Sequence, residues 1–334
     1  MDSISQWPTS VNLELTTMCP MGCPFCYCQF DSGRHMDLPV ALYWISEAAK
    51  CGVTTVSLSG GEAACYPYLE EVVKAAHERC GYVALALSGY GLTASKISSL
   101  ANAGVDAFHL SLNGSTEEIN AQTRNGYAYA MEALEAFSKL KIQNVIINSV
   151  LTQGNANDFP NIIRLAEQYG VEGISVLSQK PDSKKGLAHR PRREQVHQIA
   201  QWIVNYKGRL MISVESCYSE LVVLVYQKAN NSWIYGEQTM GCRAGRYTFS
   251  VSVDGKLIPC RHLLTYESYG TLNEYWQSSQ VLALLRRLAK EPGSGCAACA
   301  HGDICRPCVA IRKDIGGSWF APQPCLMRSN RARR

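Results

Sequence analysis

The sequence has no long apolar run, no signal peptide and little net charge, and each absence excludes a class of protein. Purely apolar runs such as residues 221–226 stop far short of the roughly 20 residues that span a bilayer. Residues 1–10 carry no basic segment followed by an apolar one, so we expect a cytoplasmic protein with no membrane partner. With 18% charged residues and a net charge of +4, no nucleic-acid partner is predicted.

Cysteine, by contrast, is abundant, with fifteen in 334 residues. Disulfide frameworks belong to small secreted domains, whereas cysteines in a reducing compartment are more often metal ligands or reactive thiols. Three of the cysteines fall within residues 19–26 and seven within residues 242–325. This distribution predicts metal clusters in two separate parts of the chain.

Between these two groups, strand-like apolar runs alternate with amphipathic helical runs. Strands are expected at residues 11–15, 54–58, 82–87, 107–112, 144–151 and 173–177, and helices at 38–50, 68–79, 94–103, 128–140, 158–169 and 192–206. Six successive β/α units imply a parallel sheet with right-handed crossovers. The predicted fold class is therefore α/β, a partial (β/α)6 TIM barrel whose active face lies at the carboxyl ends of its strands.

After residue 206 the pattern changes to a strand at 210–214, a helix-like stretch at 219–228 and a hairpin around Asp254-Gly255. We therefore expect a barrel domain at residues 1–208, a bridging region at 209–241 and a small cysteine-rich domain at 242–334. The two hairpin strands, 248–253 and 256–259, are expected to bring Cys242 and Cys260 towards each other.

Cys19, Cys23 and Cys26 follow the first predicted strand in the spacing C-x3-C-x2-C. Thiolates at such spacings can bind one iron–sulfur cube, and three ligands for a four-iron cluster leave one iron open for chemistry. Cys28 lies too near Cys26 to join the same cube easily, so a fourth-ligand role is the lesser alternative. A zinc site or packed thiols would explain the triad but not the motifs that follow the later strands.

With Phe25 before its last cysteine, this loop resembles the radical S-adenosylmethionine (SAM) superfamily. Ser59-Gly60-Gly61-Glu62 resembles the family's GGE stretch, whose backbone and carboxylate hold the SAM amino group, with Ala63 replacing the usual proline. Ser88-Gly89 stands where many members have Asn-Gly, and residues 111–114 resemble Ser-Leu-Asp-Gly, with Asn for Asp. The cofactor-binding residues that the resemblance implies are Phe25, Gly60, Gly61, Glu62, Ser88, Ser111, Asn113, Arg124 and Asn148.

The resemblance also implies the chemistry. SAM would chelate the open iron, and one electron would cleave it to methionine and a 5′-deoxyadenosyl radical that abstracts hydrogen from unactivated carbon. The barrel would orient the reactants and exclude water and oxygen. A reductase or flavodoxin is the expected electron donor.

The C-terminal cysteines occur in an order similar to that of the SPASM domain, which carries auxiliary clusters in many peptide-modifying radical SAM enzymes. Two residues separate Cys305 from Cys308, where that family usually has three. The resemblance assigns Cys242, Cys260 and Cys308 to a first auxiliary cluster, and Cys296, Cys299, Cys305 and Cys325 to a second.

The first auxiliary cluster lacks one ligand in this assignment. Either Cys217 supplies it, or one iron stays open to substrate or water. A zinc ribbon is the alternative for the two C-x2-C pairs, 296/299 and 305/308. Seven cysteines, however, are more than the four ligands of one tetrahedral zinc site and fewer than the eight of two.

The resemblance implies a peptide substrate, and the leading hypothesis is a thioether or C–C crosslink in a ribosomally synthesised precursor. The rivals are peptide epimerisation, with Cys65 or Cys28 returning the hydrogen atom, and formylglycine formation of the sulfatase-maturase kind. Small-molecule rearrangement follows, and a cysteine-rich metal-binding scaffold or a nucleic-acid module would be a different class. Only 18 residues precede Cys19, so leader recognition is expected to use a separate binding protein or this core itself.

Overall fold

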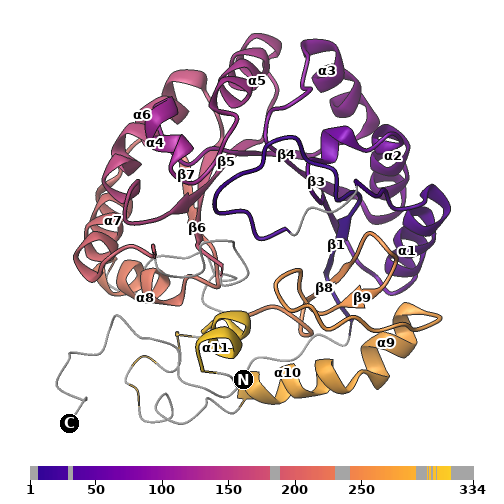
Figure 1. Ribbon diagram of the computed structural model, residues 1–334. Helices are drawn as coiled ribbons and strands as arrows, with labels where there is room; N and C mark the ends of the chain where they lie inside the picture. Colours follow the sequence, from indigo (N-terminus) through magenta and orange to yellow (C-terminus); the bar gives the residue numbers. More distant parts are fainter. Residues whose placement is uncertain are drawn as a thin grey trace.

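The computed structural model describes residues 7–28, 33–180, 189–229, 241–290, 299, 301, 304–305 and 307–316. One sheet of nine strands, in the order β7-β6-β5-β4-β3-β2-β1-β8-β9, organises this part of the chain (Figure 1). The strands are β1 (Ser10–Glu14), β2 (Thr55–Ser59), β3 (Tyr82–Leu87), β4 (Ala107–Ser111), β5 (Val145–Leu151), β6 (Gly173–Ser178), β7 (Met211–Val214), β8 (Thr248–Val251) and β9 (Leu257–Ile258). Every neighbouring pair is parallel except β8 and β9, so the predicted α/β class with a parallel sheet is confirmed.

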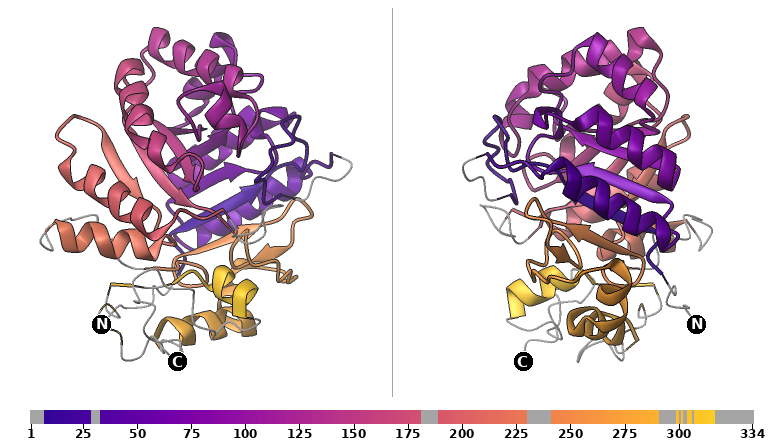
Figure 2. Two further views of the ribbon diagram at one scale, coloured as in Figure 1. Left: turned by 60° about the vertical axis from the view of Figure 1, so that its left-hand side comes forward. Right: turned by 90° about the vertical axis from the view of Figure 1, so that its right-hand side faces the viewer.

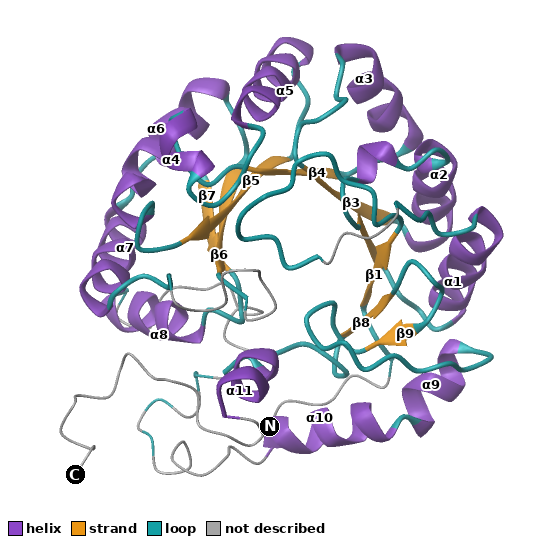
Figure 3. Cartoon of the chain, in the orientation of Figure 1, coloured by secondary structure: helices purple, strands orange, loops and turns teal. Residues whose placement is uncertain are grey.

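Helices form an arc outside the sheet, with the strands inside it (Figure 3). The long helices between strands are α1 (Leu38–Lys50), α2 (Leu69–Cys80), α3 (Ala94–Ala103), α5 (Tyr127–Leu140), α6 (Phe159–Tyr169), α7 (Arg193–Asn205) and α8 (Ser219–Lys228). Shorter turns are η1 (Ala63–Cys65), α4 (Glu117–Ala121) and η2 (Ala156–Asp158). None of the helices in the described ranges has the length and hydropathy that crossing a bilayer requires.

The barrel contains one β/α unit more than the six predicted. β7 pairs in parallel with β6, with Gly173 opposite Met211, and α8 packs against α7. Residues 209–229 therefore extend the barrel rather than only bridging two domains. Sequence patterns predicted the strand and the helix of this unit but not their place in the barrel, because β7 has only four residues and α8 is buried over its first seven residues, Ser219 to Val225. A helix buried all round lacks the amphipathic period that identifies surface helices.

The C-terminal part of the chain joins the same sheet. β8 pairs in parallel with β1, placing Ser10 opposite Thr248, and the indole Nε1 of Trp44 in α1 donates to the Gly255 carbonyl at 3.1 Å. Beyond it, α9 (Leu272–Ser278), α10 (Gln280–Lys290) and α11 (Val309–Gly316) gather at the β8–β9 end of the barrel (Figure 2). The predicted division of the chain at residues 208 and 241 stays a prediction, and the sheet runs across both points.

Successive side chains of each strand point alternately towards the helices and towards the inside of the barrel. In β5, Ile147 is fully buried, whereas its neighbours Asn148 and Val150 are half-buried and line a cavity inside the barrel. In β4, Ser111 lies directly opposite Asn148 and lines the same cavity. Since side chains alternate across a strand, apolar contacts with the helices fix which polar side chains face inward.

Aromatic packing anchors the C-terminal part, and replacing Phe249 by Ala tests this. Phe249 in β8 is fully buried, with its ring centroid 6.2 Å from that of Tyr275 and 6.4 Å from that of Trp276. We expect Phe249→Ala to lower the free energy of unfolding by about 3–5 kcal/mol, because a large cavity replaces the ring. Urea denaturation followed by tryptophan fluorescence measures this change. Tyr82→Ala, at a ring position 42% exposed, is the control, and equal losses in both variants would contradict the packing.

Candidate active site

The cysteine loop follows β1 and is held against the end of β2 by backbone hydrogen bonds. The amide of Gly61 donates to the Thr16 carbonyl at 2.6 Å, and the amide of Glu62 donates to the Met18 carbonyl at 2.8 Å. In Figure 1 the indigo segment after β1 lies inside the arc of helices. The loop is thus placed over the carboxyl end of the sheet, where barrel enzymes keep their chemistry.

Glycine is required at this contact because the two backbones leave no room for a side chain. A Cβ atom on Gly60, whose φ is +142°, would lie 2.4 Å from the Thr16 carbonyl oxygen. A Cβ atom on Gly61 would lie 2.3 Å from the Met18 carbonyl oxygen. Both glycines therefore permit a close backbone approach that positions the loop.

A single cavity of about 200 Å³ collects the sequence-predicted residues. The residues are distributed over the cysteine loop, strands β2 to β5 and the segments that follow them, and the turn after α4, and they meet only in the folded chain. Those that line the cavity are Cys19, Cys23, Cys26, Phe25, Gly60, Gly61, Glu62, Ser88, Ser111, Asn113, Arg124 and Asn148. All three cysteines of the triad and all nine residues predicted to bind the cofactor are among them.

Glu62 is the buried acidic group of this cavity. One of its carboxylate oxygens accepts from the Ser88 amide at 2.8 Å and from the Ser88 hydroxyl, and the other accepts from the Ala64 amide at 3.1 Å. Burial raises the pKa of Glu62, while the Ser88 bonds and the charge of Arg124 act in the opposite direction. Arg124 keeps a buried Nε that has no hydrogen-bond partner among the described residues.

Asn113 lines the cavity and also joins neighbouring segments through its side-chain amide. Its side-chain oxygen accepts from the Val150 amide at 2.9 Å, and its Nδ2 donates to the Thr123 hydroxyl at 3.0 Å. Asn148 similarly bonds the ring of His109 at 3.1 Å. These amides hold the wall of the cavity together while presenting polar groups to it.

The thiols around the triad differ in environment. Burial raises the pKa of Cys19 to about 11. Hydrogen bonding between Cys28 and Cys26 lowers the pKa of Cys26 and raises that of Cys28, whose thiol also donates to the Gly60 carbonyl at 3.6 Å. Cys28 lines the cavity, whereas Cys65, in η1, is not among its lining residues.

Four cysteines from distant segments gather between the barrel and the C-terminal part. Cys217 lies near enough to Cys242 and Cys308 for both thiols to affect its pKa, and Cys260 interacts electrostatically with Cys308. The contact with Cys242 is the main cause that raises the pKa of Cys217, and burial raises that of Cys260 to about 12. The described cysteines are all free thiols.

A charged pair lies beside these four thiols, at the ends of β6 and β7. The ammonium of Lys180 pairs with Glu215, donates to the Ser178 hydroxyl at 2.9 Å, and interacts electrostatically with Cys217 and Cys308. Burial acts to lower the pKa of Lys180, but Glu215 raises it overall, so both partners are charged near neutrality. A positive charge is therefore fixed next to the cysteine group.

The side chains gathered in the cavity are suited to bind the iron–sulfur cluster and the SAM that the sequence implies. Among the described residues, no three His, Cys, Asp or Glu side chains converge on a point as a single metal ion would require. An iron–sulfur cube has no such requirement, because each thiolate binds a different iron. The triad, the Glu62 carboxylate and the unpartnered Nε of Arg124 together suit a cluster and a ligand that carries both an amino group and a carboxylate. Cys299 and Cys305 are partly exposed, and Cys296 and Cys325 lie outside the described residues.

Sequence patterns missed Tyr27 and Arg261, which line the same cavity. The guanidinium of Arg261 lies over the Tyr27 ring, 4.6 Å from its centroid, and pairs with Glu14 at 3.5 Å. Arg261 comes from the C-terminal part, directly after Cys260, and that position was the only signal available.

Replacing Gly61 by Ala tests the backbone contact. The new Cβ would clash with the Met18 carbonyl, so we expect the cysteine loop to move away and stability to fall by about 1–3 kcal/mol. Alkylation of Cys19, Cys23 and Cys26 by iodoacetamide, followed by mass spectrometry, should then proceed faster than in the unaltered protein. Gly270→Ala is the control, since its Cβ would meet only the flexible carboxylate of Glu274, at 3.1 Å. Unchanged alkylation in Gly61→Ala would refute the proposed constraint.

Comparisons with known proteins agree with this geometry. Residues 13–166 match the Radical SAM superfamily. PqqA peptide cyclase of Ruegeria pomeroyi is 27% identical over 323 residues, covering 93% of this chain and 82% of that protein. PqqA peptide cyclase of Methylorubrum extorquens is 28% identical over 335 residues, covering 93% and 80%.

Two solved structures share the fold. SuiB of Streptococcus suis bound to precursor peptide SuiA superposes with a TM-score of 0.80 at 17% identity, over 98% of this chain and 77% of that one. Native anSMEcpe with bound AdoMet superposes with a TM-score of 0.72 at 16% identity, over 94% and 93%. With the cysteine triad and the glycine–glutamate turn in one cavity, residues 13–166 therefore form a domain of the radical SAM superfamily.

Proposed function

We propose that this chain is a radical SAM enzyme that installs a thioether or C–C crosslink in a ribosomally synthesised peptide. The observation that carries the proposal is the single cavity lined by the triad and by all nine predicted cofactor residues. Similarity to PqqA peptide cyclases over 93% of the chain supports a peptide as the substrate. The fold shared with SuiB, a protein solved with its precursor peptide, is consistent with it.

Cys19, Cys23 and Cys26 hold the catalytic four-iron cluster in this proposal. When bound, the cluster and SAM supply one-electron cleavage of the sulfonium and a 5′-deoxyadenosyl radical that abstracts hydrogen from the peptide. Glu62, fixed by Ser88, accepts hydrogen bonds from the SAM amino group. The unpartnered Nε of Arg124 donates to the carboxylate of SAM. Burial of these groups excludes water and strengthens their interactions.

Cys217, Cys242, Cys260 and Cys308 hold the first auxiliary cluster. The contacts of Cys217 with Cys242 and Cys308 support it as the fourth ligand, rather than leaving an iron open. The adjacent ammonium of Lys180 offsets part of the negative charge of four thiolates. Cys296, Cys299, Cys305 and Cys325 hold a second auxiliary cluster in a C-terminal domain that begins at residue 242. A reductase or flavodoxin supplies electrons, and either a separate leader-binding protein or this core itself recognises the leader of the peptide.

Peptide epimerisation is the second candidate, and the position of Cys28 favours it. Its thiol lies at the wall of the cavity, where it could return a hydrogen atom to a peptide radical, whereas Cys65 is not among the residues that line this cavity. Mass spectrometry of the product separates the two reactions. A crosslink lowers the peptide mass. Epimerisation inverts one carbon centre without changing the elemental composition, so in D2O the product gains only one deuterium.

Removing the triad tests the catalytic cluster. After anaerobic reconstitution, we expect the variant with Cys19, Cys23 and Cys26 all changed to Ala to lose the iron and sulfide of one cluster. It should also lose at least about 100-fold in dithionite-driven formation of 5′-deoxyadenosine, because no open iron remains to bind SAM. Cys80→Ala, a buried thiol of α2, should retain both. Zinc in place of iron, with SAM left intact, would instead favour the metal-binding scaffold.

Replacing Cys217 by Ala tests the first auxiliary cluster. We expect a decrease in iron and a change in the low-temperature EPR spectrum of the reduced protein, because the cluster loses one of four ligands. The signal of the catalytic cluster with SAM should persist. Cys51→Ala, which removes a partly exposed thiol at the end of α1, is the matched control. Iron content and spectra equal to those of the unaltered protein would favour the alternative with an open iron.

A further inference from the structure

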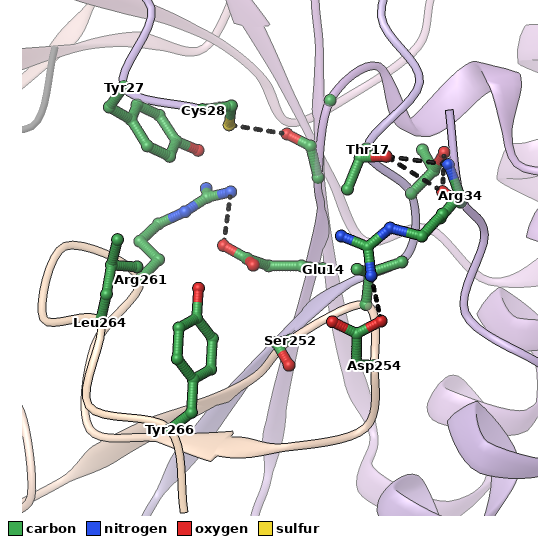
Figure 4. Close-up of a pocket in the computed structure, with 14 residues that line it drawn as sticks. Glu14, Thr17, Tyr27, Cys28, Arg34, Ser252, Asp254, Arg261, Leu264 and Tyr266 are labelled. Atoms are coloured by element: carbon green, nitrogen blue, oxygen red, sulfur yellow. Dashed lines mark hydrogen bonds and ion pairs between the residues drawn. The ribbon is translucent and has the colours of Figure 1, made fainter. Parts of the chain in front are cut away.

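A second cavity, of about 340 Å³, lies beside the one that holds the triad (Figure 4). Its walls come from the end of β1, the end of the cysteine loop and the segment that runs from the β8–β9 turn to Tyr266. The residues that line both cavities are Tyr27, Cys28, Gly60, Gly61 and Arg261. A ligand in the second cavity would therefore contact the same side chains as the contents of the first.

Among the described residues that line the second cavity, the charges cancel. The charged ones are Glu14, Arg34, Asp254 and Arg261. Arg261 pairs with Glu14 at 3.5 Å, and Arg34 pairs with Asp254. A charged ligand would meet a like charge beside each opposite one, so the wall favours a neutral ligand.

Large apolar surface is exposed on the same wall. Leu264 is 49% exposed and Tyr266 is 52% exposed, although both come from an ordered segment next to β9. Figure 4 shows the Tyr266 ring below Arg261 and Glu14, with its hydroxyl directed towards them. An aliphatic or aromatic side chain seated here would remove this surface from water, which is worth about 25 cal/mol for each Å² buried.

Arg261 also has hydrogen-bonding capacity to spare. Among the described residues its guanidinium makes one long hydrogen bond, to Glu14 at 3.5 Å, although a guanidinium carries five N–H donors. A neutral acceptor such as a peptide carbonyl can bond its terminal nitrogens without adding charge.

We propose that the second cavity binds a neutral segment of the peptide substrate. An aromatic or aliphatic side chain of that segment packs on Leu264 and Tyr266, and a backbone carbonyl accepts a hydrogen bond from Arg261. The inference rests on the proposed peptide-modifying function and adds where the peptide lies and which chemistry it presents there. Because Arg261 and Tyr27 line both cavities, the bound segment lies next to the SAM site.

Blocked pentapeptides of the form acetyl-Ala-Ala-Xaa-Ala-Ala-amide, with Xaa as Tyr, Leu, Glu or Lys, are the probes. Saturation-transfer NMR measures their binding to the reconstituted holoenzyme with SAM. The Tyr and Leu peptides should bind at least about 5-fold more tightly than the Glu and Lys peptides, as burial of one apolar side chain predicts. Tightest binding by Glu or Lys, or no binding by any peptide, overturns the inference.

Two variants separate the two contacts. Leu264→Ser with Tyr266→Ser should abolish the preference for Tyr and Leu, whereas Leu140→Ser with Tyr82→Ser, at positions 37% and 42% exposed outside both cavities, should retain it. Arg261→Lys keeps the charge that faces Glu14 but removes the guanidinium fork, so it should weaken binding of the Tyr and Leu peptides about 5-fold. A preference that survives the loss of Leu264 and Tyr266 overturns the inference.

Different measurements test the proposed function and the peptide site in the second cavity. Formation of 5′-deoxyadenosine without any peptide reports only on the cluster and SAM. Its absence from the reconstituted protein counts against the proposed function, whereas its presence together with unselective peptide binding counts against the second cavity alone.

Discussion

The close approach of two backbone segments, residues 16–18 and residues 60–62, determines where the chemistry of this protein takes place. Two hydrogen bonds, from the Gly61 amide to Thr16 and from the Glu62 amide to Met18, join the cysteine loop to the turn after β2. The same turn directs the Glu62 carboxylate to Ser88, at the end of β3. One local contact therefore aligns the triad, the acidic group and the adjacent strand. The parallel sheet adds Ser111 and Asn148 to the same wall, because they lie opposite each other in β4 and β5.

Motifs that are short in sequence could be predicted, because their members are brought together by a single turn or loop. The triad and Ser59-Gly60-Gly61-Glu62 each lie within eight residues or fewer. Residues such as Asn113 and Arg124 were predicted from the family resemblance, and the structure adds that the Asn113 amide also bonds Val150 and Thr123. The six β/α units were predicted because amphipathic helices carry a clear period.

The remaining features depend on contacts between distant segments, which no local pattern encodes. Arg261 meets Glu14 across 247 positions of sequence, and Cys217 meets both Cys242 and Cys308. The strand β7 and the helix α8 were predicted, but their place in the barrel was not, since a strand of four residues and a helix buried over its first seven residues carry little periodicity. The second cavity likewise has walls from both ends of the chain, and its balanced charges exist only after those ends meet.

The pairing of β8 with β1 has a consequence for biosynthesis. The first strand of the sheet remains an unpaired edge until residues 248–251 have left the ribosome, which is a late event for a chain of 334 residues. Open strand edges promote aggregation, and such long-range closure is slow. During this interval the cysteine loop lacks its neighbours from the C-terminal part, so the contact of Arg261 with the Tyr27 ring is among the last to form.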